Sequence, residues 1–140
     1  FVAAGLEIVQ SVYPGWSFDA ADAIAANALH GRLVIGAPVR GAEGGLGEVV
    51  ARLPELAVRL SREGEDVAEG AGRNALGGPL TAVAHLVRLA ADTASIGRLG
   101  AGEIVTTGTL TDAHPVAPGQ TWTLSAADGA LPPLTLTLTD

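Results

Sequence analysis

The segment Leu134–Thr139 alternates Leu and Thr without interruption, and this pattern most constrains the fold. A period of two places each Leu on one face of an extended chain and each Thr on the other, which is typical of a half-buried strand. Thr121–Ala126, Arg32–Ile35 and Glu103–Leu110 (EIVTTGTL) predict further strands. The chain is therefore expected to be rich in β-structure.

Two more strand regions are expected. Val2–Tyr13 is mainly apolar and ends at the turn pair Pro14-Gly15. Leu56–Arg62 and Asp66–Glu69 flank a charged turn and predict a β-hairpin, whose acidic tip is most simply a solvated cluster. We expect three or more of the strands to share one mixed sheet.

Two helices are predicted beside the sheet. Asp19–His30 is rich in Ala, with Ser17 or Asp19 as a possible N-cap and Gly31 placed to end the helix. Pro79–Leu89 is the clearest helix, because apolar residues recur at helical spacing and form one stripe. The stripe consists of Leu80, Val83, Ala84, Val87 and Ala91. The Gly-rich stretch 41–47 is expected to be irregular.

Composition excludes several classes of function. The 140 residues hold 8 Arg, no Lys and 15 acidic residues, giving a formal charge of -7, so nucleic acid and anionic membranes are poor partners. No apolar run approaches the ~20 residues of a membrane span. With no Cys, there is no disulfide framework or thiolate metal site, which suits a cytoplasmic protein. The missing Lys removes Schiff-base chemistry from this stretch.

Glu7 is the one carboxylate in the apolar segment at the start of the chain. Alternation places it on the same face as Gly5, Val9 and Ser11, so its near neighbours are small. One interpretation is that this face is open to solvent. The other is that Glu7 binds a hard cation such as Mg²⁺ or Mn²⁺ through oxygen.

No strong catalytic motif accompanies Glu7. His30, His85 and His114 lack metal-ligand spacing, and His85 falls within the predicted apolar helix. The Gly-rich stretch has neither the Lys nor the residue order of a phosphate loop. No Ser lies in a GxSxG setting.

Four segments carry a resemblance to a known family. LEIVQSVY is similar to IEIVDSRY, and DAIAANALHGRLVIG to DxIADNASSGxxVxG. The third segment, GEDVAEGAGRNALGGPLTAVAHLVRLA, is similar to GEVVxxGxGxxxLGHPxNxVxWLAxxL. The fourth, GAGEIVTTGTLTDAHPVAPGQTWTL, is similar to xAGDIVLTGxLxxxxPVxxGDxxxx. In this order, they resemble the 2-keto-4-pentenoate hydratase and 4-oxalocrotonate decarboxylase branch of the fumarylacetoacetate hydrolase superfamily, whose enzymes serve aromatic catabolism.

The resemblance implies an α+β fold, a mixed β-roll with two flanking helices. It also implies a cleft in which three carboxylates hold Mg²⁺ or Mn²⁺, the third of them being Glu7. The ion binds the 2-keto acid end of the substrate and stabilises enolate charge. Thr107 would line the substrate pocket, and Asn27 and Leu29 would contact substrate or order the cleft. We further predict that Leu6–Ser11 pairs with Glu103–Thr109 to form the floor of this cleft.

The other two carboxylates and a catalytic Lys of the family come from a preceding half. We therefore expect residues 1–140 to be a single domain that forms the C-terminal part of a longer chain. A partner chain could also supply the missing half, and the resemblance suggests a homo-oligomer. The 140-residue chain alone is expected to be inactive.

Several positions depart from the family motifs. Val12 stands for an Arg and Ala26 for an Asp, so a charged pair has been lost from both ends together. Leu29 replaces a Ser, and Gly78 replaces the His of Gly-His-Pro. These changes weaken the case for the usual hydratase substrate.

The function implied is a metal-dependent, hydratase-like lyase acting on a 2-keto acid or 2-hydroxydienoate through a metal-bound enolate. A 4-oxalocrotonate-type decarboxylase is the close alternative, because both reactions pass through such an enolate. A third hypothesis is a diverged, non-metal member that binds or shapes a larger apolar molecule.

Overall fold

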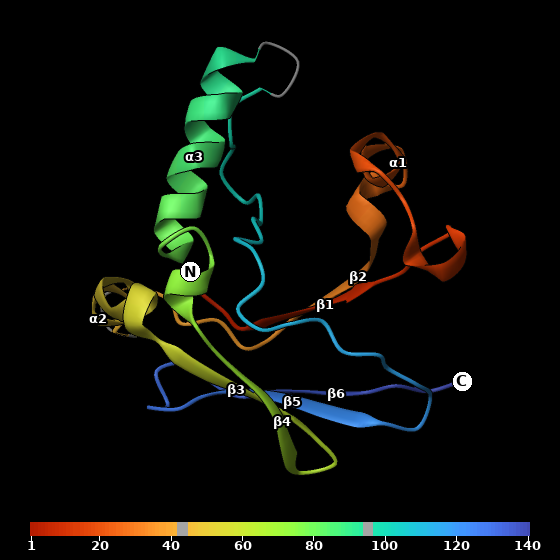
Figure 1. Ribbon diagram of the computed structural model, residues 1–140. Coiled ribbons are helices and arrows are strands. Elements are labelled where there is room, and N and C mark those ends of the chain that lie inside the picture. Colours follow the sequence, from red (N-terminus) through yellow and green to blue (C-terminus); the bar gives the residue numbers. More distant parts are fainter. Residues whose placement is uncertain (42–44, 94–96) are drawn as a thin grey trace.

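The structure is a computed structural model that describes residues 1–41, 45–93 and 97–140. Within these ranges the chain forms two antiparallel sheets and several helices (Figure 1). One sheet pairs β1 (Gly5–Val9) with β2 (His30–Ile35), and the other has the order β4-β3-β5-β6. Its strands are β3 (Ala57–Arg62), β4 (Glu65–Ala71), β5 (Thr121–Ala126) and β6 (Leu134–Thr137). The α+β class is confirmed, with antiparallel rather than mixed pairing.

The helices lie at two ends of the molecule, with the first apart from the second and third (Figure 1). They are α1 (Ala20–Ala25), α2 (Leu46–Arg52) and α3 (Pro79–Asp92), and the short 3₁₀ segments are η1 (Pro14–Trp16), η2 (Asn27–Leu29), η3 (Leu53–Glu55) and η4 (Gly72–Asn74). Figure 1 shows α1 at the far end of the β1–β2 ribbon and α3 on the opposite side. The sequence predicts that the stretch 41–47 is irregular. Residues 42–44 lie outside the described ranges, and α2 begins at Leu46, so the last residues of the stretch are helical.

The predicted hairpin is confirmed. β3 and β4 pair in antiparallel fashion, with Arg62 opposite Glu65. Glu63 and Gly64 form the two-residue turn with φ of 52° and 85°. Two successive left-handed residues match the right-handed twist of the flanking strands, which is why this type of turn closes tight hairpins.

The predicted first helix is correct in place but too long. Asp19 caps α1, because its side chain accepts a hydrogen bond from the Asp22 backbone N–H at 2.9 Å. The helix ends at Ala25 rather than near Gly31, because the backbone turns left-handed at Asn27. Within the described residues α3 extends the predicted second helix to Asp92.

The predicted strand Glu103–Leu110 is wrong. No strand forms there, and β1 pairs with β2 instead of with this segment. A β-branched sequence needs a neighbouring strand to pair with, and among the described residues this segment has none in register. It is held by other contacts, such as the 2.8 Å hydrogen bond from Asn74 Nδ2 to the carbonyl oxygen of Leu110. The predicted cleft floor is therefore absent from the described structure.

The core lies where the two sheets meet. Leu53, Leu56, Val58 and Leu131 are buried together, and Val2 packs against them. No side chain in the described ranges is completely enclosed. The base of the β1–β2 ribbon is thus anchored to the core, while the end that carries Val9 and His30 projects from it. None of the described helices is long and apolar enough to cross a membrane.

Candidate metal and substrate site

Glu7 lies on the outward face of β1, as alternation predicts. Leu6 and Ile8 are half-buried, whereas Gly5, Glu7 and Val9 are exposed. The Glu7 side chain retains 40% of its accessible surface. Its carboxylate is therefore accessible to a ligand without being fully in solvent.

The register of the ribbon brings His30 to Glu7. Glu7 lies opposite Leu33, and an irregularity between Ile8 and Val9 sets Val9 opposite His30. Because Val9 and Glu7 share a face, this places the imidazole beside the carboxylate. Nδ1 of His30 lies 2.7 Å from Oε1 of Glu7, which is hydrogen-bonding distance. This pairing is not apparent from the sequence, where the two residues are 23 positions apart.

The turn that delivers His30 is strained. Asn27, Ala28 and Leu29 all have left-handed backbones, with φ of 53°, 53° and 62°. This conformation costs roughly 1–2 kcal/mol for each residue that carries a Cβ. The turn is held by the Gln10 backbone N–H, which donates to the Leu29 carbonyl at 2.9 Å. Strain of this kind concentrates at functional sites.

Two further predicted site residues, Asn27 and Leu29, lie in the turn that leads to the partner of Glu7. Asn27 and Leu29 belong to the strained turn, and His30, the next residue after it, contacts Glu7. His30 lies opposite Val9 at the end of the β1–β2 ribbon that joins this turn, and Glu7 lies in the middle of β1. Whether Asn27 and Leu29 contact a substrate stays a prediction.

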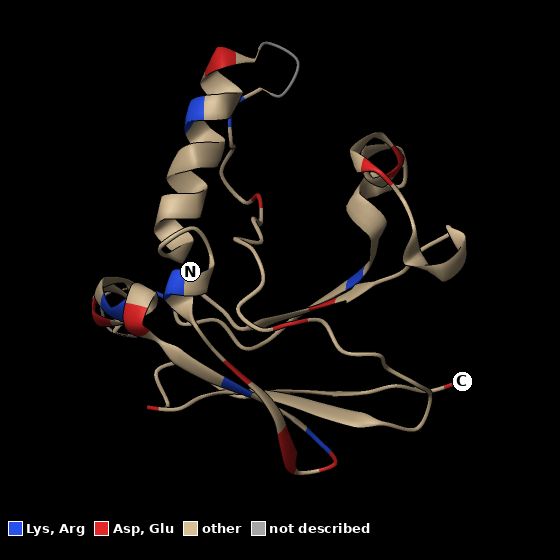
Figure 2. Ribbon diagram, in the orientation of Figure 1, with Lys and Arg blue, Asp and Glu red and all other residues tan. Residues whose placement is uncertain are grey.

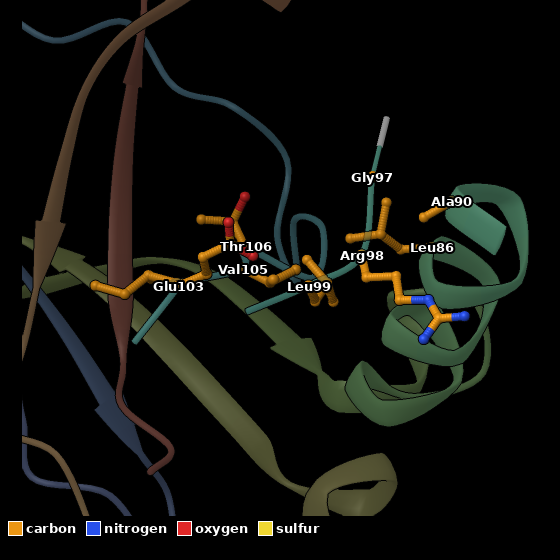
Figure 3. Close-up of a pocket in the computed structure, with 9 residues that line it drawn as sticks. Leu86, Ala90, Gly97, Arg98, Leu99, Glu103, Val105 and Thr106 are labelled. Atoms are coloured by element: carbon orange, nitrogen blue, oxygen red, sulfur yellow. The ribbon is translucent and has the colours of Figure 1, made fainter. Parts of the chain in front are cut away.

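Thr107 has no such link to Glu7. It is half-buried in the irregular segment after α3, and no hydrogen bond joins it to the ribbon in the described structure. A cavity of about 500 Å³ lies between this segment and α3. Figure 3 shows Leu86 and Ala90 beside the helix α3 and Glu103 at the end of the lining farthest from that helix. Thr106 lines this cavity, and Thr107 is not among its lining residues.

A divalent ion fits the donors at Glu7 in part. The carboxylate supplies oxygen and the imidazole nitrogen, and both side chains are accessible. Arg32 lies opposite Ile8 and therefore on the other face of the ribbon, where its guanidinium donates to the Gly31 carbonyl at 2.9 Å. In the described residues no third His, Cys, Asp or Glu joins the pair. Further ligands would have to come from another segment, substrate or water.

The charged residues of the β3–β4 hairpin have a structural explanation. Figure 2 shows acidic residues at the tip of the β3–β4 hairpin. Arg59 pairs there with Asp66 at 3.0 Å and with Glu69 at 3.4 Å. The acidic tip thus remains a surface cluster, as the sequence indicates. His85 is exposed on α3.

No family model matches the chain. A 4-oxalocrotonate decarboxylase of Pseudomonas sp. (strain CF600) is 34% identical over 125 residues, which cover 89% of this chain and 44% of that protein. A 2-keto-4-pentenoate hydratase of Paraburkholderia xenovorans (strain LB400) is 36% identical over 126 residues, covering 85% and 41%.

Solved structures agree with these relatives. The 4-oxalocrotonate decarboxylase from Pseudomonas putida G7, complexed with magnesium and adipate, superposes with a TM-score of 0.84 and 32% identity. The match covers 97% of this chain and 48% of that one. The same enzyme complexed with calcium and acetate gives a TM-score of 0.81.

The chain spans less than half the length of the curated relatives that it matches. Over that span the sequence and structural matches agree, and they confirm the resemblance seen in the four sequence segments. The chain is a relative of the 2-keto-4-pentenoate hydratase and 4-oxalocrotonate decarboxylase branch of the fumarylacetoacetate hydrolase superfamily.

Proposed function

We propose that the chain is the C-terminal part of a metal-dependent, hydratase-like lyase that acts on a 2-keto acid or 2-hydroxydienoate. The observation that carries the proposal is the accessible carboxylate of Glu7, held 2.7 Å from His30 beside a strained turn. A Glu that only faced solvent would need neither the neighbouring imidazole nor the strained turn. Solved relatives complexed with magnesium and calcium support a divalent ion.

Each residue then has a distinct task. Glu7 would hold a divalent ion, whose positive charge would stabilise enolate charge on the substrate. Asn27 carries an amide that can donate to a substrate oxygen. Leu29 presents an apolar side chain from the same turn and would contact the hydrocarbon part of the substrate. Thr107 is proposed to line the substrate pocket.

Decarboxylation of a 4-oxalocrotonate-like acid is the second candidate. It is favoured by the two solved structures described above, which are both of a 4-oxalocrotonate decarboxylase. The residues of this chain would act alike in both reactions, because each needs the enolate charge to be stabilised at the same place.

A diverged, non-metal member that binds a larger apolar molecule is the third candidate. Leu29 makes the turn less polar than the family motif, and Val12 is 75% exposed. Both changes enlarge the apolar surface near the end of the ribbon. This candidate predicts that substitution of Glu7 leaves ligand binding unchanged.

We also propose that another polypeptide segment covers the exposed apolar surfaces of this chain. The predicted stripe on α3 is not turned into the core: Leu80, Ala84, Val87 and Ala91 are exposed, while Ala90 is buried. At the other end of the molecule Ile24 is 79% exposed. Since the curated relatives are more than twice as long as the matched span, the proposed occupant is a segment equivalent to their remaining part. We also propose that the protein forms a homo-oligomer and is located in the cytoplasm.

The test is an assay of the 140-residue chain alone and mixed with the remaining part of a homologous hydratase. We expect Mg²⁺- or Mn²⁺-dependent loss of 2-hydroxypenta-2,4-dienoate absorbance in the mixture only. Release of CO₂ from 4-oxalocrotonate instead would favour the decarboxylase. If the mixture binds metal and converts neither substrate, the lyase proposal fails.

A further inference from the structure

The ion pair of Glu7 differs in kind from the other ion pairs of the described residues. The remaining side-chain pairs all join a carboxylate to an arginine: Arg52 to Asp128, Arg59 to Asp66 and Glu69, and Arg73 to Glu55. Within the same described ranges, Glu7 is the carboxylate that faces an imidazole. A guanidinium stays protonated and cannot bind a cation, whereas a neutral imidazole nitrogen is a common metal ligand.

The position of the two donor atoms suits shared coordination. Ligand atoms that lie ~2.1 Å from an ion and at right angles to each other are ~3 Å apart. Nδ1 of His30 and Oε1 of Glu7 are 2.7 Å apart, and both side chains are more than one-third exposed. An ion could therefore replace the proton that the two atoms now share, with little movement of either side chain.

The backbone fixes His30 in this position from both sides. The left-handed turn Asn27–Leu29 precedes it, and Gly31 follows it. A Cβ on Gly31 would lie 2.8 Å from the carbonyl oxygen of Ile8, so the strands approach closely at this point. The family motif DxIADNASSGxxVxG has Ser where this chain has His30. The same turn thus presents a nitrogen donor where the motif has a hydroxyl.

We infer that His30 is a second metal ligand beside Glu7 and that it determines which metal the site prefers. The inference deepens the proposed function and depends on it. An imidazole nitrogen adds affinity for ions of the first transition series, least of all for Mn²⁺, whereas Mg²⁺ favours oxygen ligands and gains less still. The site would therefore select a transition ion such as Mn²⁺ over Mg²⁺, and His30 would be the specificity-determining residue.

The experiment is pulsed electron paramagnetic resonance of Mn²⁺ added to the 140-residue chain mixed with the remaining part of a homologous hydratase, together with calorimetric titration of Mn²⁺ and Mg²⁺ into the same mixture. Wild type should show ¹⁴N modulation from a bound imidazole. His30→Ser should lose this modulation and bind Mn²⁺ roughly tenfold more weakly, while its Mg²⁺ affinity changes little. His85→Ala, which removes an exposed histidine on α3, is the matched control and should behave as wild type.

The possible results separate the inference from the function on which it rests. The absence of ¹⁴N modulation in wild type, or its persistence in His30→Ser, overturns the inference and leaves the role of Glu7 standing. Wild-type Mn²⁺ affinity in Glu7→Gln overturns the proposed function itself. Circular dichroism checks the fold of each variant, and His30→Gln replaces His30→Ser if the latter does not fold.

Discussion

Gly31 on β2 lies against Ile8 on β1 so closely that a Cβ there would come within 2.8 Å of the Ile8 carbonyl oxygen. The atom in the way belongs to the backbone, so a clash cannot be relieved by a side-chain rotation. This contact adjoins the position of His30 and therefore couples the spacing of the ribbon to the candidate metal site.

Gly31→Ala is expected to lower the free energy of unfolding by about 1–3 kcal/mol, the usual cost of overpacking. Chemical denaturation measures the effect. Gly47→Ala is the matched control, because no atom lies within 4 Å of the added Cβ and the site is inside α2. Because Ala favours a helix more than Gly does, Gly47→Ala should raise the free energy of unfolding by up to ~1 kcal/mol. Equal effects of the two substitutions would contradict the close approach.

Ala28→Gly is expected to stabilise the protein by roughly 0.5–1 kcal/mol, because Gly tolerates the left-handed backbone at φ of 53°. If the strain serves the site, metal affinity should fall at the same time, since the turn that carries His30 becomes looser. Thermal denaturation and metal titration provide the two measurements. Ala25→Gly in α1 is the control and should destabilise, since its backbone is helical. A destabilising Ala28→Gly would argue against strain in the turn.

Glu7→Gln should abolish or strongly weaken binding of Mg²⁺ and Mn²⁺ while changing the stability of the metal-free chain only modestly. The side chain keeps its size, and the lost ion pair with His30 is half-exposed and therefore worth at most about 1 kcal/mol. Calorimetry measures the affinity. Glu48→Gln on α2, also an exposed carboxylate, should bind metal as wild type does. Equal metal affinity for Glu7→Gln and wild type would rule out Glu7 as a ligand.

Leu80→Glu tests the exposed face of α3. Leu80 is 51% exposed in this chain, so the charge should alter stability by less than about 1 kcal/mol. It should nevertheless prevent association with the segment proposed to cover this face, because a desolvated carboxylate is costly. Analytical ultracentrifugation of the mixed halves reports the association. Arg88→Glu, at an exposed position of the same helix, is the control for negative charge and a demanding one, because it shifts the net charge by two units where Leu80→Glu shifts it by one. If Leu80→Glu associates as well as Arg88→Glu does, another surface carries the contact.

Local sequence patterns predicted the parts of the fold that depend on local physics. The β3–β4 hairpin follows from its turn and its alternation, and the outward direction of Glu7 follows from the period of its strand. The start of α3 follows from Pro79 and helical spacing. Each of these features is decided by residues a few positions apart.

The remaining features depend on contacts between distant segments. The early end of α1 and the Glu7–His30 pair both arise from the left-handed turn and the register irregularity between Ile8 and Val9, which hydrophobic periodicity does not encode. The stripe on α3 is expected to face the core because an apolar face normally seeks cover. Whether a given apolar face is covered depends on which other segments pack against it, and such segments can be distant in the sequence.

β3 pairs on one side with β4 through a two-residue turn and on the other side with β5, which follows only after α3 and a long irregular segment. The first pairing closes a very short loop and the second a long one, whose entropic cost grows only slowly with length. The hairpin is therefore expected to form early in folding and to provide the edge on which β5 later assembles. Chain length between Ala71 and Thr121 can accordingly vary with little penalty to the sheet.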